Sequence, residues 1–467
     1  MGARSGSNYL SALKRQKAEV WLGGERVAEV TSHPALRECA RSIASLYDMQ
    51  MERVEQMTYR TDDGGRSGLS FIQPKSIEEL RKRSRMMAAW ANFSGGMMLQ
   101  TPDTVNVAIA AMASAREFFA ASDPRYGDNI ATYYLEARKH DWCATHTLIG
   151  PDAHFEKTAD GVIVSGPGAM TALAPFAEEL VVFPSVRERG AIALAFAIPC
   201  QTKGLKFLCR DRFDSDRSAF DAPLSSRFDV MDCSVVFENV LVPWSRVFLS
   251  GDAPRCEALL DETGARANMM HQAAVHNLAK VELFLGIAVR IGESNIGYLP
   301  GLRQSTLGFA SKVAQPSGAT ELGQSFLDRL TEAITGMGTI RRSLREAEDL
   351  AALDQFGVLK PGRIPLESAR NLFAKLYPRI VELVQLLSGP NLIATAREED
   401  IAYAHTRERT KLFRLACDAT TSAFAGRHLL HERSLLADSI TLPKDPALAT
   451  DVTPLARRID EFLDRVG

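Results

Sequence analysis

The sequence predicts an α+β protein in which an N-terminal helical domain and a C-terminal helical bundle flank a central β domain. Through residues 1–150, and again after residue 271, apolar residues recur every three to four positions, which is the helical period. Between these regions, short β-branched and aromatic runs are separated by Gly, Pro, Asp and Ser, which is typical of a compact sheet or barrel. We therefore expect domains at 1–150, 151–270 and 271–467.

Two helix starts can be identified in the N-terminal region. Ser76 precedes Ile-Glu-Glu-Leu, so we expect it to cap a helix with an acidic first turn. The phrase Thr101–Asp103 predicts a second start, with Thr as cap, Pro at the first helical position and Asp at the positive end of the helix dipole. Gln100 and Thr104 then flank a helix N-terminus, where backbone N–H groups favour ligand binding.

The central and C-terminal regions differ in period. After His271 the spacing is helical, and Pro378 predicts a kink in one of the later helices. The β-rich runs of the central region are Gly161–Ser165, Leu180–Pro184, Ala191–Ile198, Leu205–Leu208 and Ser234–Phe237.

One histidine stands between two threonines where a helix gives way to a strand. His146 lies between Thr145 and Thr147, and Gly150-Pro151 then breaks the chain. A histidine in this setting either packs in the core or faces a pocket, and the local residues alone favour a core histidine.

Composition excludes several classes of protein. The 467 residues are 46% hydrophobic and 24% charged, which is ample for a large core. The 55 basic and 57 acidic side chains give a net charge of -2, which argues against a nucleic-acid or anionic membrane partner. No apolar run approaches the ~20 residues of a membrane span, and no secretory signal follows Met1. We expect a cytoplasmic protein.

Metal and nucleotide motifs are missing from the sequence. The seven cysteines are scattered and never form Cys-x-x-Cys, so neither a disulfide framework nor a metal cradle is indicated. The glycine phrases at Gly166 and Gly336 lack the third glycine of a dinucleotide fingerprint. His428 and His431 fit a solvated helix face better than a metal site. We expect no bound metal.

Short phrases spread over nearly the whole chain carry a further signal. They are Thr31–Ala35, Trp90–Ala91, Ser94–Met97, Thr145–Leu148, Leu173–Ala177, Phe196–Pro199, Gly204–Arg210, Pro223–Asp229, Val240–Trp244 and Ser422–Arg427. Together they resemble the 4-hydroxyphenylacetate 3-hydroxylase family. The resemblance implies an acyl-CoA dehydrogenase-like fold with a central β-barrel domain, and a homo-oligomer, either tetramer or dimer. It also implies reduced FAD from a partner reductase and hydroxylation of phenols.

The resemblance also implies a substrate site, and this chain departs from its pattern. The family uses an Arg and a Tyr of an Arg-Ser-Pro-Asp-Tyr phrase together with the His of Thr-His. Gln100 and Thr104 replace the Arg and the Tyr, and only His146 is kept. A neutral amide and a small hydroxyl do not supply the same charge and ring contact. We take His146 as a hydrogen-bond donor or general acid/base, and Gln100 and Thr104 as groups that orient a substrate oxygen. A purely structural role stays open for each.

The flavin side departs from the family pattern as well. Ala172 aligns with a Thr that approaches the flavin in the family, although Thr171 is adjacent. Gln385 is kept, but Asn391 replaces a glycine that passes close to the dinucleotide. The resulting altered or vestigial flavin site consists of Thr147, Asp152, Thr171, Ala172, Gln385 and Asn391. The cofactor is therefore FAD or none.

The related 4-hydroxybutyryl-CoA dehydratases hold an iron–sulfur cluster through cysteines near position 100. Leu99 and Asp103 occupy that neighbourhood here, which excludes this branch.

Functions from different classes follow from these departures. The first is a flavin-independent, redox-neutral cyclisation or rearrangement of a bulky polyketide-like metabolite, in which a shaped cavity biases a reactive conformer. The alternative is an FADH2-dependent two-component monooxygenase that acts on an aromatic or natural-product substrate and needs a flavin reductase. A second alternative is a non-catalytic pseudoenzyme. Because both the flavin and the substrate residues have changed, we expect the first function.

Overall fold

Two open β-sheets form the central part of the protein. The computed structural model of the chain describes residues 2–150, 152–185, 193–213, 217–296, 321–401 and 404–437. The larger, seven-stranded sheet has the order β2-β1-β11-β12-β7-β6, with β8 paired to β12. Its strands are β1 (Glu19–Leu22), β2 (Glu25–Arg26), β6 (His154–Lys157), β7 (Gly161–Pro167), β8 (Thr171–Ala172), β11 (Leu205–Cys209) and β12 (Asp232–Pro243).

The smaller sheet has four strands in the order β13-β10-β9-β5. They are β5 (Ala144–Leu148), β9 (Glu179–Phe183), β10 (Leu194–Pro199) and β13 (Val247–Ser250). Each sheet ends in strands that pair on one side only, so within the described residues neither sheet closes. The expectation of a closed β-barrel is therefore corrected to two open sheets. Each predicted β-rich run overlaps one strand (β7, β9, β10, β11 or β12); Ala191 and Ile192 lie outside the described residues.

The N-terminal region contributes strands as well as helices. β1 pairs in parallel with β11, with Val20 opposite Phe207, and thereby extends the larger sheet. Val20 is fully buried, so this short strand forms part of the core. Two small hairpins lie outside both sheets: β3 (Thr58–Arg60) with β4 (Arg66–Gly68), and β14 (Ala352–Leu353) with β15 (Leu359–Lys360).

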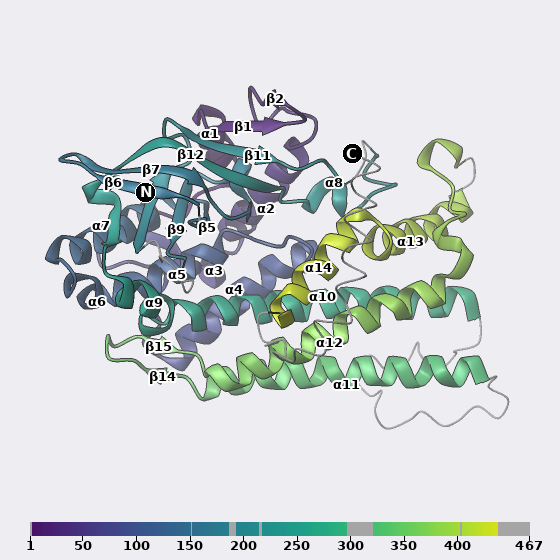
Figure 1. Ribbon diagram of the computed structural model, residues 1–467. Coiled ribbons are helices and arrows are strands. Elements are labelled where there is room, and N and C mark those ends of the chain that lie inside the picture. Colours follow the sequence, from purple (N-terminus) through teal and green to yellow (C-terminus); the bar gives the residue numbers. More distant parts are fainter. Residues whose placement is uncertain are drawn as a thin grey trace, which may run out of the picture.

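Long helices lie alongside the sheets (Figure 1). α10 contacts α4 and α5 as well as α11 and α12, so it connects the N-terminal helices to the C-terminal ones. None of the helices in the described ranges combines the length and the apolarity that a membrane span needs. The helices are α1 (Gly6–Arg15), α2 (Arg37–Glu52), α3 (Val54–Met57), α4 (Ile77–Ser94), α5 (Asp103–Ser114), α6 (Arg116–Ala120), α7 (Pro124–His140), α8 (Ser225–Phe228), α9 (Ala253–Glu262), α10 (Ala265–Ile296), α11 (Glu321–Asp349), α12 (Arg363–Ser388), α13 (Ala404–Thr420) and α14 (Ala423–Ala437).

The two predicted helix starts have different outcomes. Ser76 caps α4 as predicted, because its side chain accepts a hydrogen bond from the Glu79 N–H at 3.2 Å. α5 begins at Asp103, one residue later than predicted, and Thr101 does not cap it. The Thr101 hydroxyl instead contacts the Asp103 carboxylate at 2.5 Å and the His276 ring at 3.2 Å. A charged acceptor competes better for the hydroxyl proton than a peptide group does.

A group of buried charges joins the larger sheet to the C-terminal helices. Asp232, at the start of β12, accepts hydrogen bonds from Arg210 on one side and from Arg427 of α14 on the other. Burial raises the pKa of Asp232, but the hydrogen bonds and charges of the two arginines outweigh this effect, so the net pKa lies below the ordinary 3.8.

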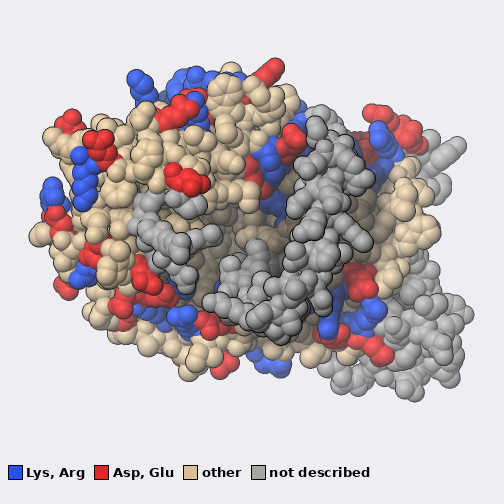
Figure 2. All heavy atoms as spheres, in the orientation of Figure 1, with Lys and Arg blue, Asp and Glu red and all other residues tan. Residues whose placement is uncertain are grey.

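On the surface, basic and acidic side chains are interspersed over the face shown in Figure 2.

We expect Asp232→Asn to lower the free energy of unfolding by about 3–5 kcal/mol at neutral pH, because the buried Arg427 would lose its carboxylate partner. Arg210 would lose one of its two carboxylate partners and keep Asp229. The depressed pKa of Asp232 contributes stability that is present above the unfolded value and is lost as pH falls through the folded value. The difference between variant and wild type should therefore shrink below about pH 4. Urea unfolding at several pH values measures this.

Asp128→Asn is a matched control, since the ion pair of Asp128 with Arg116 is exposed and should matter much less. Equal losses in the two variants would contradict a structural role for the Asp232 cluster.

Candidate functional site

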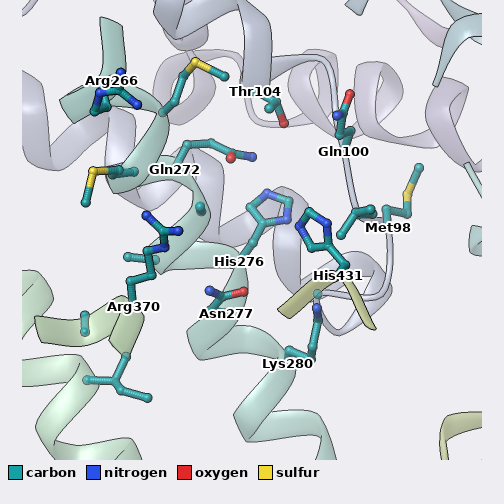
Figure 3. A pocket seen from close by; sticks show the side chains of 18 of the residues that line it. Met98, Gln100, Thr104, Arg266, Gln272, His276, Asn277, Lys280, Arg370 and His431 are labelled. Atoms are coloured by element: carbon teal, nitrogen blue, oxygen red, sulfur yellow. The ribbon is translucent and has the colours of Figure 1, made fainter. Parts of the chain in front are cut away.

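A cavity of about 400 Å³ lies between α5, β5 and α10, and α12 and α14 also contribute to its wall. Its apolar wall includes two consecutive methionines of α10, Met269 and Met270. Figure 3 shows polar side chains that converge on it from several elements. The polar and charged lining residues are Gln100, Thr104, His146, Arg266, Gln272, His276, Asn277, Lys280, Arg370 and His431.

The structure brings the three predicted catalytic residues to this one cavity. Gln100 precedes α5 and Thr104 lies in its first turn. His146 is the central residue of β5, opposite Val181 of β9. Because side chains alternate along a strand, Thr145 and Thr147 point away from His146. Their hydroxyls donate to the carbonyls of Ala172 and Ala169, at 2.6 and 2.7 Å.

His146 is an imidazole without a charged partner. Burial lowers its pKa to about 4, so the ring is neutral at neutral pH. Its Nδ1 has no hydrogen-bond partner among the described residues, and the ring packs against Phe183 with 5.7 Å between centroids. The Oε1 atom of Gln100 is likewise buried without a partner. Buried polar atoms of this kind are usually satisfied by a ligand or water.

Helix α10 supplies a polar stripe that sequence reasoning missed. Gln272, His276 and Lys280 are four residues apart, so they lie on one face of the helix, and all three line the cavity (Figure 3). The sequence analysis did not single out His276. The polar positions at helical spacing within a largely apolar helix were the available signal.

The charge of the cavity wall has one sign. Arg266, Lys280 and Arg370 line it, and no Asp or Glu occurs among its described lining residues. A wall of this composition favours a ligand that carries an anionic or electron-rich group.

The residues predicted for the flavin side do not line this cavity. Thr171 donates to the His146 carbonyl at 2.6 Å. On α12 and just after it, Gln385 donates to the Thr420 carbonyl at 2.8 Å, and Asn391 donates to Ser388 at 3.0 Å. Ala172 is buried in the short strand β8, and Asp152 is exposed. Their contact with a cofactor stays a prediction.

Comparisons with known proteins match this chain to one family over nearly its whole length. The family model described as "4-hydroxyphenylacetate 3-hydroxylase N terminal" matches residues 5–154 and 153–249, and the corresponding C-terminal model matches residues 296–441. The 4-hydroxyphenylacetate 3-monooxygenase oxygenase component of Geobacillus sp. (strain PA-9) is 35% identical, over 99% of this chain and 97% of that protein. The protein of the same name from Thermus thermophilus is 33% identical over the same shares.

A similar solved structure is the oxygenase component of 4-hydroxyphenylacetate 3-monooxygenase complexed with FAD and 4-hydroxyphenylacetate. It has a TM-score of 0.82 and 31% sequence identity, and the match covers 99% of both chains. These similar proteins are named monooxygenases rather than cyclases or isomerases.

We expect His146→Gln to make the protein less sensitive to acid. The pKa of His146 is depressed from 6.5 to about 4, so its contribution to stability is present above the unfolded value and is lost as pH falls through the folded value. Between about pH 7 and pH 5 the wild type should therefore lose about 2 kcal/mol more than the variant. Denaturant unfolding at both pH values measures the difference, and equal losses would show that His146 is not a buried neutral imidazole.

Proposed function

The chain belongs to the 4-hydroxyphenylacetate 3-hydroxylase family of flavin monooxygenases and has its acyl-CoA dehydrogenase-like fold, and on this basis we propose that it is the oxygenase component of a two-component monooxygenase. In this proposal it takes reduced FAD from a separate reductase and hydroxylates an aromatic or related natural-product substrate. The expected flavin-independent cyclase finds no support among the relatives, and neither does the absence of a cofactor.

One observation carries the proposal. Gln100, Thr104 and His146 correspond to the family's phenol-binding Arg, Tyr and His, and they line one cavity. In this proposal the location of the substrate site is kept, while two of its three side chains have changed.

In this proposal the cavity holds the ring end of a flavin together with a substrate ring. About 400 Å³ lies within the usual range for ligand sites, although it is too small for a whole dinucleotide. Met98, Leu99 and Met270 offer apolar surfaces for flat rings. Gln100 and His146 offer buried polar atoms without protein partners. Reduced FAD, when bound, would supply the electrons that activate O2 for transfer of one oxygen atom to the substrate. We also propose that the cofactor is contacted by Thr147, Asp152, Thr171 and Ala172.

The chain's own residues bind and orient the substrate. Neutral His146 forms a hydrogen bond with a substrate oxygen. The Gln100 amide and the Thr104 hydroxyl orient this oxygen in the cavity. Gln100, unlike the family's Arg, carries no positive charge. Lys280 on α10 and Arg370 on α12 supply positive charge from other walls of the cavity, so an acidic substituent of the substrate points toward those helices.

We also propose that the protein forms a homo-oligomer through its C-terminal helices. Leu386 at the end of α12, Ile393 just after it and Leu430 on α14 are large apolar side chains that are 59%, 92% and 69% exposed. A second copy of this chain would cover them. Gln385 and Asn391 adjoin this surface in sequence, so we propose that they contact the cofactor at the interface between copies.

We expect oxygen from O2 to appear in the product. With a flavin reductase, NADH and a panel of phenolic acids under 18O2, mass spectrometry should detect a hydroxylated product that is heavier by one 18O atom. Omission of the reductase should abolish this product. A product of unchanged composition that forms without oxygen or reductant would contradict the proposed function and support a redox-neutral reaction.

We expect the double variant Gln100→Arg, Thr104→Tyr to bind 4-hydroxyphenylacetate about 10- to 100-fold more tightly than the wild type, because it restores a charge-assisted hydrogen bond and a ring contact. Calorimetric titration measures the gain, with the two single variants as controls. If affinity does not change, the cavity does not correspond to the family's phenol site.

A further inference from the structure

We propose that His276 is the base of this cavity, held by Thr101 and Asp103 so that its unpartnered ring nitrogen takes the proton from the hydroxyl group of the substrate. This inference rests on the proposed function, from which it takes an aromatic substrate with a hydroxyl group.

Helix packing brings the three residues together. His276 lies on α10 and faces the start of α5, where its Nε2 is 3.2 Å from Thr101 Oγ1 and 3.8 Å from Asp103 Oδ2. Thr101 and Asp103 are fully buried. The Thr101 hydroxyl lies 2.5 Å from Asp103 Oδ1. The arrangement has the order carboxylate, hydroxyl, imidazole.

The hydrogen-bonding capacity of Thr101 fixes the tautomer of His276. A hydroxyl group has one proton to donate and two lone pairs to accept with. The proton goes to the Asp103 carboxylate, since a charged acceptor gives the stronger bond. The oxygen of Thr101 therefore accepts, from the Gln272 amide at 3.4 Å and from the Nε2–H of His276. His276 Nδ1 is then left with a lone pair.

This lone pair has no partner in the protein. His276 Nδ1 is buried without a hydrogen bond among the described residues, although the residue lines the cavity. Figure 3 shows the ring projecting from α10 into the space between Gln272 and His431. A buried acceptor without a donor is costly. A substrate hydroxyl in the cavity would supply the donor.

The proposed step is a simple proton transfer. The O–H bond of the substrate breaks, its electron pair stays on oxygen, and an N–H bond forms at Nδ1 of His276. The products are a phenolate and an imidazolium, and no electrons are exchanged with any other group. The imidazolium is stabilised by the Asp103 carboxylate, whose Oδ2 has no hydrogen-bond partner among the described residues.

His146 is less suited to the same step. Its pKa of about 4 makes it a weak proton acceptor, and no carboxylate hydrogen-bonds to its ring among the described residues. The two histidines therefore have different roles. The neutral His146 ring hydrogen-bonds to the substrate oxygen, and His276 accepts the proton.

Imidazole 15N NMR of the purified protein tests the arrangement without any turnover. The His276 signals are identified by their loss in His276→Gln. We expect an Nε2-protonated, Nδ1-unprotonated ring near pH 8 in the wild type and in Thr101→Ser, and loss of that preference in Thr101→Val. An Nδ1-protonated ring, or a preference that survives in Thr101→Val, would overturn the proposal.

Kinetics on the complete system tests the role. We expect His276→Gln to lower kcat by about 100-fold or more, with a much smaller change in KM, and to abolish the acid limb of the pH–rate profile. Thr101→Val should lower kcat, and Thr101→Ser should restore most of it. The other titratable or charged groups around the ring are Asp103 on α5, His146 on β5, Arg266 and Lys280 on α10, Arg370 on α12 and His431 on α14.

The two experiments separate this inference from the proposed function. If the wild type incorporates 18O and His276→Gln keeps its rate and its acid limb, His276 is not the base, although the monooxygenase stands. If the expected tautomer is found but no hydroxylation occurs with any phenolic acid, the proposed function fails, and with it the role of His276 toward a phenol.

Discussion

The close approach of the turn after α4 to the backbone of α10 sets two walls of the cavity, the start of α5 and the middle of α10. Gly95 and Gly96 both have positive φ, at 59° and 73°. A Cβ atom at Gly96 would lie only 2.6 Å from the carbonyl oxygen of His276, and one at Gly95 only 2.7 Å from a side-chain carbon of Leu283. Glycine is therefore required at both positions for conformation and for space. This contact sets the start of α5 against the middle of α10, so that Thr101 and Asp103 meet His276.

Much of the fold could be predicted from local sequence patterns. Periodicity located the β-rich runs, and the Ser76 cap was correct because it depends on residues three positions apart. Closure of the sheets was predicted wrongly, since it depends on which distant strands pair. β1 pairs with β11, which lies far away in the sequence, and no local pattern reveals such a pairing. Thr101 was taken for a cap, but its hydroxyl donates to the Asp103 carboxylate and also contacts His276, which is 175 residues away.

In the candidate site, too, the residues carried by local phrases could be predicted, and those that depend on distant contacts could not. Gln100, Thr104 and His146 could be identified because short phrases carry them, and the structure places all three on one cavity. The proposed role of His276 could not be predicted, since it depends on a buried carboxylate in another helix. The loss of Arg and Tyr from the family's phenol site favoured a redox-neutral function, but the sequence could not show that Lys280 and Arg370 bring positive charge to the same cavity from other elements. In the proposed function, these substitutions reflect a changed substrate and not a lost cofactor.

Anaerobic titration of the protein with FADH2, followed by the absorbance and fluorescence of the reduced flavin, tests the central claim most directly. We predict saturable binding, with a preference for reduced over oxidised flavin and a spectral change when a phenolic acid is added. Binding should weaken in Gly96→Ala, where the added methyl group would push α10 away from α5. A folded protein that binds neither form of the flavin would contradict the claim that this chain is the oxygenase component of a flavin monooxygenase.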